Sequence, residues 1–216
     1  MGMTMRILWP IRPETAVRID AKFLDPQYVS WRRKAGLPPA EHNGIDINIA
    51  GTYGDGDEGY PVIAFAEGKV VSVSRHRVWG WIILIEHDKV PGYSKLWSQY
   101  AHVKFPCVAI GDYVMAGEAI AAIGKGDPIA PFLAHLHFEL RKNLVAPDYW
   151  PGMNKAEIIA NYIDPEDYIK KHKDPSWRFV RKDLRFITPN LDTATSVQYI
   201  VNLDPAGDRV WIRKTS

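Results

Sequence analysis

Three histidines and one aspartate, grouped in two short clusters, are the residues of this chain best suited to chemistry. His42 and Asp46 stand in the segment HNGID, and His135 and His137 stand far downstream in the segment HLH. A catalytic zinc site takes three nitrogen or oxygen ligands from the protein and leaves a fourth position to water. The four side chains therefore predict a metal site, provided that the fold brings the two clusters together.

Strand geometry allows both downstream histidines to reach one site. Side chains two positions apart share a face of a strand, so His135, His137 and Glu139 share one face. The alternate residues of this segment are apolar and predict the core face: Leu136, Phe138 and Leu140. A rise of about 3.3 Å per residue separates the Cα atoms of the two histidines by about 6.6 Å. Spacing alone leaves open which of the two would bind a metal.

The upstream cluster requires a bend. Alternation in the segment HNGIDINI places Asp46 on the polar face of a strand. A straight strand would hold His42 about 13 Å from Asp46, too far for one ion with ligand bonds of about 2 Å. We therefore expect a bend at Asn43 and Gly44, where glycine permits unusual backbone dihedrals. Two histidines and one carboxylate are also the ligands of non-haem iron oxygenases, so the metal is not fixed by these residues alone.

Composition narrows the class of protein. A chain of 216 residues fits one domain, or one domain with a small extension. Its formal charge of only +2 argues against a nucleic-acid-binding protein. No apolar run approaches the about 20 residues of a membrane span. The N-terminal apolar stretch is too short for a secretory signal. We therefore expect either a trimmed chain or a protein that leaves its cell by another route, such as lysis. The single cysteine, Cys107, permits no internal disulfide and is expected to be buried.

Short apolar segments, separated by glycine and proline at intervals of about ten residues, predict a mainly β chain with an antiparallel core. The expected strands are Ile45–Ala50, Pro61–Ala66, Gly68–Arg75, Trp79–His87, Leu96–Val103, Tyr113–Met115, Ala119–Ile123 and Leu136–Arg141. Short helices are expected at Lys155–Ile163 and Pro165–Lys171, whereas residues 6–40 are expected to be irregular apart from a helical turn near Tyr28–Lys34. The sequence Lys173-Asp174-Pro175 predicts a boundary between a domain at 1–174 and a β-rich extension at 175–216. This extension is expected to contain strands near 178–187, 197–203 and 209–213, as a brace or an accessory unit.

Five motifs, in order, resemble the lysostaphin/LytM-type zinc endopeptidases, which cut peptide cross-links in bacterial cell walls. They are HNGIDI at 42–47, PVIAFAEGKV at 61–70, YAH at 100–102, GDYVMAGEAI at 111–120 and HLHFE at 135–139. The segment IDP at 163–165 is similar to the one that usually ends this domain. The resemblance covers roughly residues 7–170 and implies an antiparallel sheet core related to the barrel-sandwich hybrid.

The resemblance also implies roles for the polar residues. His42, Asp46 and His137 would be the zinc ligands, and His102 and His135 would be the catalytic pair. The implied function is zinc-dependent hydrolysis of stem or cross-bridge peptides of peptidoglycan, outside the cytoplasm, as by a phage-type lysin. Neither the cross-link that is cut nor the oligomeric state follows from the sequence.

Two loops depart from the family pattern. Residues 51–60 are longer and more acidic than usual, and they are expected to form either a solvated rim or a contact to a substrate amine or a cation. Residues 124–134 carry two prolines where the family usually has a Gly/Ser-rich loop. The substrate specificity of the family therefore does not transfer to this chain. Some of the tryptophans at 31, 79, 81 and 97 could line a glycan groove, whereas His76, His87 and His172 match no motif.

Two other functions fit parts of the sequence. One is a catalytically inactive relative that binds peptidoglycan or serves as a structural virion protein. The other is a lipoyl/biotinyl-like carrier, which Val62–Val73 and Gly111–Gly124 resemble. A carrier requires a modifiable lysine on a hairpin tip, usually beside methionine, and no Met-Lys pair lies between these segments. The carrier would also leave the histidines unexplained.

Overall fold

The computed structural model describes residues 5–11, 17–126, 132–173, 199–203 and 210–214. The chain divides into two compact units, Met1–Lys173 and Asp174–Ser216. In the second unit, β11 (Tyr199–Leu203) pairs with β12 (Val210–Lys214) in an antiparallel two-stranded sheet. The strand expected near 178–187 lies outside the described residues. It stays a prediction that this unit is a separate extension that acts as a brace or an accessory unit.

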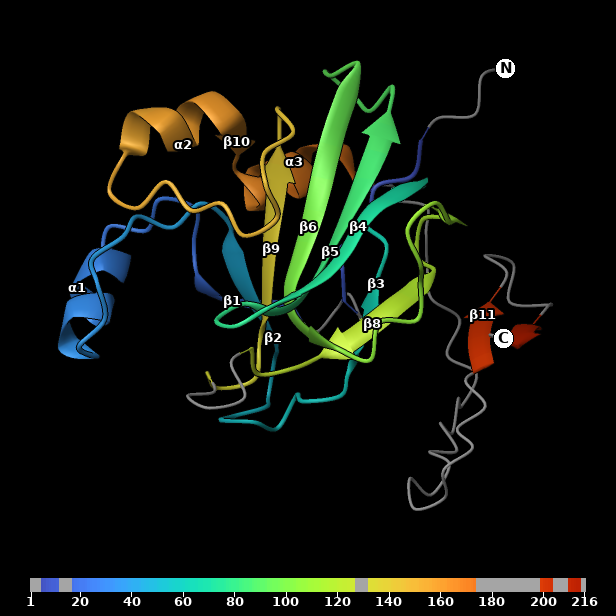
Figure 1. The fold of residues 1–216 in the computed structure, drawn as a ribbon, viewed down its shortest axis with the longest axis horizontal. Coiled ribbons are helices and arrows are strands. Elements are labelled where there is room, and N and C mark those ends of the chain that lie inside the picture. Colours follow the sequence, from blue (N-terminus) through green and yellow to red (C-terminus); the bar gives the residue numbers. More distant parts are fainter. Residues whose placement is uncertain (1–4, 12–16, 127–131, 174–198, 204–209, 215–216) are drawn as a thin grey trace. The chain divides into compact units, whose positions relative to one another are not determined.

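The first unit is built on one sheet, whose described strands all pair in antiparallel fashion (Figure 1). The main path runs in the order β1-β2-β9-β6-β5-β4-β7, while β8 joins β3 to β6 and β10 pairs with β9. The strands are β1 (Val17–Ala21), β2 (Ile45–Ile49), β3 (Pro61–Ile63), β4 (Gly68–His76), β5 (Gly80–Asp88), β6 (Lys95–Lys104), β7 (Tyr113–Val114), β8 (Ala119–Ile123), β9 (Leu136–Arg141) and β10 (Tyr162–Ile163). The mainly β, antiparallel fold class is confirmed.

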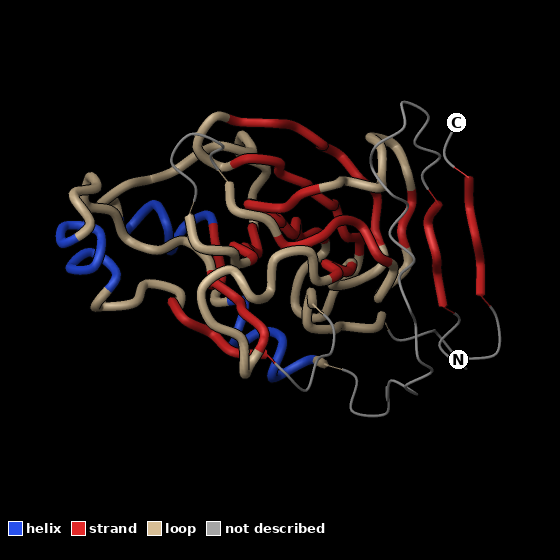
Figure 2. Tube along the Cα trace, turned by 90° about the horizontal axis from the view of Figure 1, so that it is seen from below, coloured by secondary structure: helices blue, strands red, loops and turns tan. Residues whose placement is uncertain are grey.

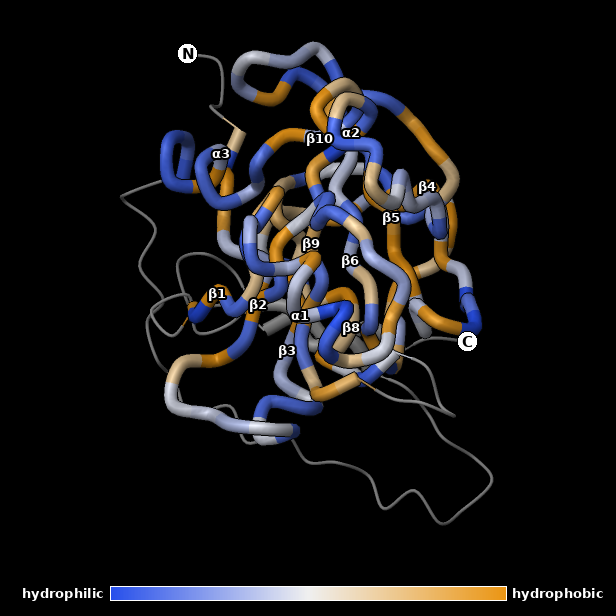
Figure 3. Tube along the Cα trace, turned by 90° about the vertical axis from the view of Figure 1, so that its left-hand side faces the viewer, coloured by the Kyte–Doolittle hydropathy of each residue, from blue (hydrophilic) through white to orange (hydrophobic). Residues whose placement is uncertain are grey.

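Alternating apolar residues of the strands form the main core. Ile45 and Ile47 of β2 and Phe138 of β9 are fully buried in it, beside Tyr100 of β6. The tube coloured by hydropathy shows hydrophobic and hydrophilic residues in short alternation along the strands (Figure 3). Because strand side chains alternate between faces, Asp46 of β2 and His137 of β9 point away from this core.

The described helices of the first unit are short and lie around its strands (Figure 2). They are α1 (Tyr28–Lys34), α2 (Lys155–Asn161) and α3 (Pro165–His172). Asn154 caps α2 by accepting a hydrogen bond from Glu157 N, and Asp164 caps α3, which begins with proline. No helix among the described residues is long and apolar enough to cross a membrane.

Two local expectations were wrong. The helix expected at 155–163 ends at Asn161, because Tyr162 is extended and pairs with Arg141 of β9. Segment 6–40 is not irregular throughout, since it contains β1, which pairs with β2. Both strands depend on partners distant in the sequence, so local propensity could not reveal them.

Candidate metal and catalytic site

The pairing of β2 with β9 places the two predicted ligand clusters side by side. Asp46 and His137 are direct partners in the antiparallel register. The chain bends at Asn43 and Gly44, as expected, and returns His42 toward Asp46. The need for glycine differs from the one expected, because Gly44 has no left-handed φ. A Cβ atom at this position would lie 2.5 Å from the carbonyl oxygen of Phe138, so only glycine lets the two segments approach.

Three potential ligand atoms converge at this point. Asp46 Oδ1 lies 3.2 Å from His42 Nε2 and 2.9 Å from His137 Nδ1, and the two nitrogens are 3.1 Å apart. Ligand atoms of a tetrahedral zinc ion with bonds of about 2.0–2.1 Å would be about 3.3 Å apart. The donor set therefore fits a small ion with little adjustment. His42, Asp46 and His137 also form a group of possible metal ligands by mutual distance, with all ligand atoms within 4.8 Å of one another.

The second nitrogen of each histidine in this group is already engaged. His42 Nδ1 lies 2.9 Å from the carbonyl oxygen of Lys22, and His137 Nε2 lies 3.0 Å from Glu139 Oε1. An imidazole that donates one N–H to an oxygen offers the lone pair of its other nitrogen to a metal. The hydrogen bonds thus direct His42 Nε2 and His137 Nδ1 toward Asp46.

The surrounding charges favour a cation between these groups. Burial raises the pKa of the Asp46 carboxyl, but the facing histidines outweigh burial and hold this pKa well below its usual range. Burial lowers the pKa of His137, yet its hydrogen bonds to Asp46 and Glu139 raise it overall to about 9. Since metal ligands must be deprotonated, an ion would compete with the proton on His137 Nδ1.

The two predicted catalytic histidines lie beside these groups. The ring centroids of His102 and His135 are 4.7 Å apart, and His135 Nε2 lies 3.8 Å from Asp46 Oδ1. His102 Nδ1 lies 3.1 Å from the carbonyl oxygen of Trp79, and His135 Nδ1 lies 2.7 Å from that of Leu133. Each neutral ring therefore donates through Nδ1 and keeps the lone pair of Nε2 available.

The surroundings of His102 are unusual in two ways. Its φ is +59°, a left-handed conformation that non-glycine residues seldom adopt, and its backbone N–H also donates to the carbonyl oxygen of Trp79. Burial, followed by the nearby His135 and His137, lowers the pKa of His102 well below its usual value. The ring is therefore neutral and can act as a base at neutral pH.

Aromatic rings hold the histidines in place. Trp79 stacks on His102 with an interplanar angle of 13°, and Tyr28 of α1 stacks on His42 at a centroid distance of 4.2 Å. Trp150 packs on Trp79, and the guanidinium of Arg32 lies over Trp150. Trp79 is only 6% exposed, so its ring packs against the site histidines and offers little surface to a glycan.

The acidic loop uses its carboxylates within the protein. Asp55 pairs with Lys125 and accepts a hydrogen bond from Ala134 N, and Glu58 pairs with Lys104. Asp57 is fully buried and accepts from Asn48 Nδ2. These contacts favour the rim interpretation of residues 51–60 over a cation site.

Two residues with reactive side chains lie apart from the site. Cys107 is half-buried, contrary to expectation, and burial raises the pKa of its thiol to about 11. His87 is fully buried between the carbonyl oxygen of Glu67 and the hydroxyl of Ser98. Neither a thiolate nor a charged histidine is therefore available there at neutral pH.

Residues 40–149 match the family model described as peptidase family M23. The chain belongs to this family. The resemblance to lysostaphin/LytM-type peptidases expected from the motifs is thus confirmed, and membership favours a peptidase over the carrier.

Similar proteins agree with this assignment. Lysostaphin of Staphylococcus simulans is 29% identical over 171 residues, which cover 74% of this chain and 31% of lysostaphin. The chain thus spans about a third of the length of this relative. The structure of LytU is 26% identical with a TM-score of 0.52 and covers 71% of this chain and 85% of LytU. A chain of the SpoIIIAH–SpoIIQ complex shares the fold, with 21% identity, a TM-score of 0.51 and coverage of 76% and 99% of the two chains.

Proposed function

We propose that the chain is a zinc endopeptidase that hydrolyses stem or cross-bridge peptides of bacterial peptidoglycan, outside the cytoplasm. The convergence of His42 Nε2, Asp46 Oδ1 and His137 Nδ1, beside two further imidazoles, carries this proposal. Family membership and the similarity to lysostaphin support a peptidase that acts on cell walls.

The residues divide the chemistry between them. His42, Asp46 and His137 would hold zinc, which lowers the pKa of its bound water and polarises the scissile carbonyl. His102 and His135 lie beside these residues, with ring centroids 4.7 Å apart. In the neutral form, one ring accepts the proton of the attacking water. The other, as an imidazolium, would stabilise the oxyanion and donate its own proton to the leaving amine.

Substitution of single histidines separates metal binding from catalysis. His102→Ala and His135→Ala are expected to retain zinc and to lose hydrolysis by about 10²–10⁴-fold, because each removes a proton-transferring group. His42→Ala and Asp46→Ala are expected to lose both zinc and hydrolysis. Metal content is measured by atomic emission, and hydrolysis by zymography on purified peptidoglycan with and without chelator.

A matched control is His172→Ala, because His172 lies at the end of α3 and outside the site. This variant should keep both zinc and activity. A His137→Ala protein that lacks zinc and is fully active would overturn the ligand assignment.

The second candidate is a wall-binding or structural protein without catalysis. It is favoured by the fold shared with the SpoIIIAH–SpoIIQ complex, which is described as pore-forming. Zymography distinguishes the two functions. Binding to peptidoglycan without chelator-sensitive clearing would favour the second.

A further inference from the structure

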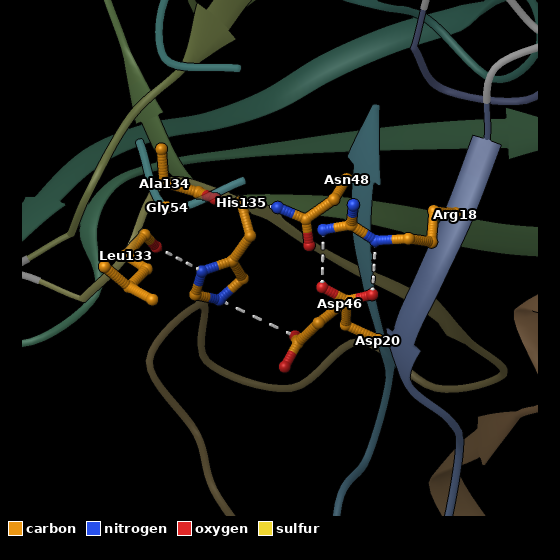
Figure 4. Close-up of a pocket in the computed structure, with 8 residues that line it drawn as sticks. All are labelled: Arg18, Asp20, Asp46, Asn48, Gly54, Leu133, Ala134 and His135. Atoms are coloured by element: carbon orange, nitrogen blue, oxygen red, sulfur yellow. Dashed lines mark hydrogen bonds and ion pairs between the residues drawn. The ribbon is translucent and has the colours of Figure 1, made fainter. Parts of the chain in front are cut away.

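A pocket adjoins the site on the side of β1. It is lined by Arg18, Asp20, Asp46, Asn48, Gly54, Leu133, Ala134 and His135 (Figure 4). Asp46 and His135 belong to the proposed metal and catalytic groups, so this pocket opens directly onto the reacting centre. The remaining residues have no role in the hydrolysis described above.

Asp20, which lines this pocket, stands at a β-bulge. Arg18 pairs with Asn48 and Ile19 with Ile47, but Ala21 pairs with Asp46, so Asp20 is an extra residue in β1. Such bulges bend a strand locally and re-aim a side chain, and they are frequent beside active sites. Asp20 lies two positions after Arg18, and its carboxylate meets the guanidinium of Arg18 at the pocket (Figure 4).

The guanidinium of Arg18 is held from two sides. Nε and Nη2 donate to the two carboxylate oxygens of Asp20 at 2.7 and 2.9 Å, and Nη1 donates to the carbonyl oxygen of Thr52 at 2.6 Å. A guanidinium has five N–H groups, so two of them have no partner among the described residues and can serve a ligand. The Asp20 oxygens likewise keep lone pairs beyond those that Arg18 uses. The pair therefore presents a donor group and an acceptor group in fixed positions.

The exposure of the Arg18 and Asp20 side chains favours a role of this ion pair in ligand recognition. The side chains of Arg18 and Asp20 are 32% and 48% exposed. Ion pairs this accessible to water stabilise a fold by only about 0–1 kcal/mol. Stability alone thus gives little reason for a bidentate ion pair beside the pocket.

The wall between His135 and the ion pair includes apolar surface. Leu133 is 67% exposed, and Ala134 is fixed by the hydrogen bond from its backbone N–H to Asp55. A ligand with an aliphatic stem would cover Leu133, and a charged terminus would reach Arg18 and Asp20. Ligand sites commonly combine apolar lining with a few fixed polar groups.

We propose that this pocket is a specificity subsite for a substrate residue whose aliphatic side chain ends in both a carboxylate and an ammonium group. Arg18 binds the carboxylate and Asp20 binds the ammonium group. This is the chemistry of a diaminopimelate residue whose side-chain amine is not acylated in the cross-link, whereas a glycine bridge has neither group. The inference rests on the proposed function, since it assigns the substrate class to the same site.

Matched peptides test the subsite. The zinc-loaded protein is assayed with a cross-linked peptide containing diaminopimelate, with the same peptide amidated at the side-chain carboxylate, and with a pentaglycine-bridged peptide. The wild-type protein should cleave the first with a kcat/KM about tenfold above the second, because amidation removes the group that Arg18 binds. Arg18→Gln should abolish this ratio without changing zinc content, and Asp20→Asn should reduce it. Arg33→Gln, on the exposed face of α1, should preserve it.

The possible failures are distinguishable. Equal cleavage of the free and amidated peptides, preference for the glycine bridge, or an unchanged ratio in Arg18→Gln would overturn the subsite while leaving the peptidase intact. If the protein cleaves no peptide and no wall preparation, the proposed function fails. Calorimetric binding of the two diaminopimelate peptides then decides the subsite, and equal affinities would refute it.

Discussion

Glu139 offers a sharp test of how the protein supports the metal site. It is fully buried on β9, and Oε1 accepts hydrogen bonds from His137 Nε2 at 3.0 Å and from Asn43 Nδ2 at 2.9 Å. Oε2 accepts from Arg141 Nε at 2.7 Å. The carboxylate thus connects a proposed zinc ligand to a fully buried guanidinium.

The two substitutions of Glu139 should differ in size. Glu139→Ala removes the only carboxylate that the structure pairs with Arg141 among the described residues, and breaking such a buried pair costs about 3–5 kcal/mol. Arg141 also donates to the carbonyl oxygens of Val145, Ala146 and Pro147, so we expect about 3 kcal/mol. Glu139→Gln keeps the volume and one acceptor, so about 1–2 kcal/mol is expected.

Metal affinity gives a second readout, independent of hydrolysis. Loss of an outer hydrogen-bond partner of a ligating histidine typically weakens metal binding by about 10–100-fold. Stability is measured by urea unfolding of the metal-free protein, and affinity by competition with a chromogenic chelator. Glu86→Gln is the control, because the half-buried Glu86 pairs with Lys95 on the surface and should cost about 1 kcal/mol or less. The reasoning is refuted if Glu139→Ala binds zinc as tightly as the wild type and is equally stable.

Two further predictions concern residues whose roles emerged from the structure. Gly44→Ala should lower the free energy of unfolding by about 2 kcal/mol and weaken zinc binding, because its Cβ would collide with the carbonyl oxygen of Phe138; unchanged unfolding and zinc titrations would count against this. Burial lowers the pKa of His87 to about 4, below the about 6.5 of an unfolded chain, so the unfolded state binds more protons between these values. The contribution of His87 is therefore complete above pH about 6.5 and is lost as pH falls toward 4, by up to about 3 kcal/mol. Urea unfolding from pH 4.5 to 7 should show a steeper slope in the wild type than in His87→Gln, because the lowered pKa of His102 acts in both proteins, and parallel curves would contradict it.

Local patterns predicted much of the sheet. Alternation of apolar and polar residues in the segments HLHFEL and HNGIDINI predicted β9 and β2, because one face of each strand is buried in the main core. The same alternation placed Glu139 on the face of His137, but nothing local indicated that it would accept the ring N–H of that histidine. This contact depends on the rotamers of two buried side chains.

The residues beside the site were harder to predict. β1 is short and only partly buried, and the prolines around it resemble those of a loop. Its pairing with β2 and its bulge at Asp20 are long-range properties, so the pocket at Arg18 had no signal in the sequence. The family resemblance supplied His102, whose left-handed backbone also has no local signature.

The backbone of His102 has a consequence for engineering. A non-glycine residue held at a φ of +59° stores about 1 kcal/mol or more of strain, which glycine would release. A screen that rewards heat resistance alone would therefore enrich His102→Gly wherever this relief exceeds the lost packing on Trp79, and it would discard a proposed proton-transferring group. Thermostable variants of this protein should be selected with hydrolysis scored in the same round, so that tolerance to heat is gained elsewhere in the sheet.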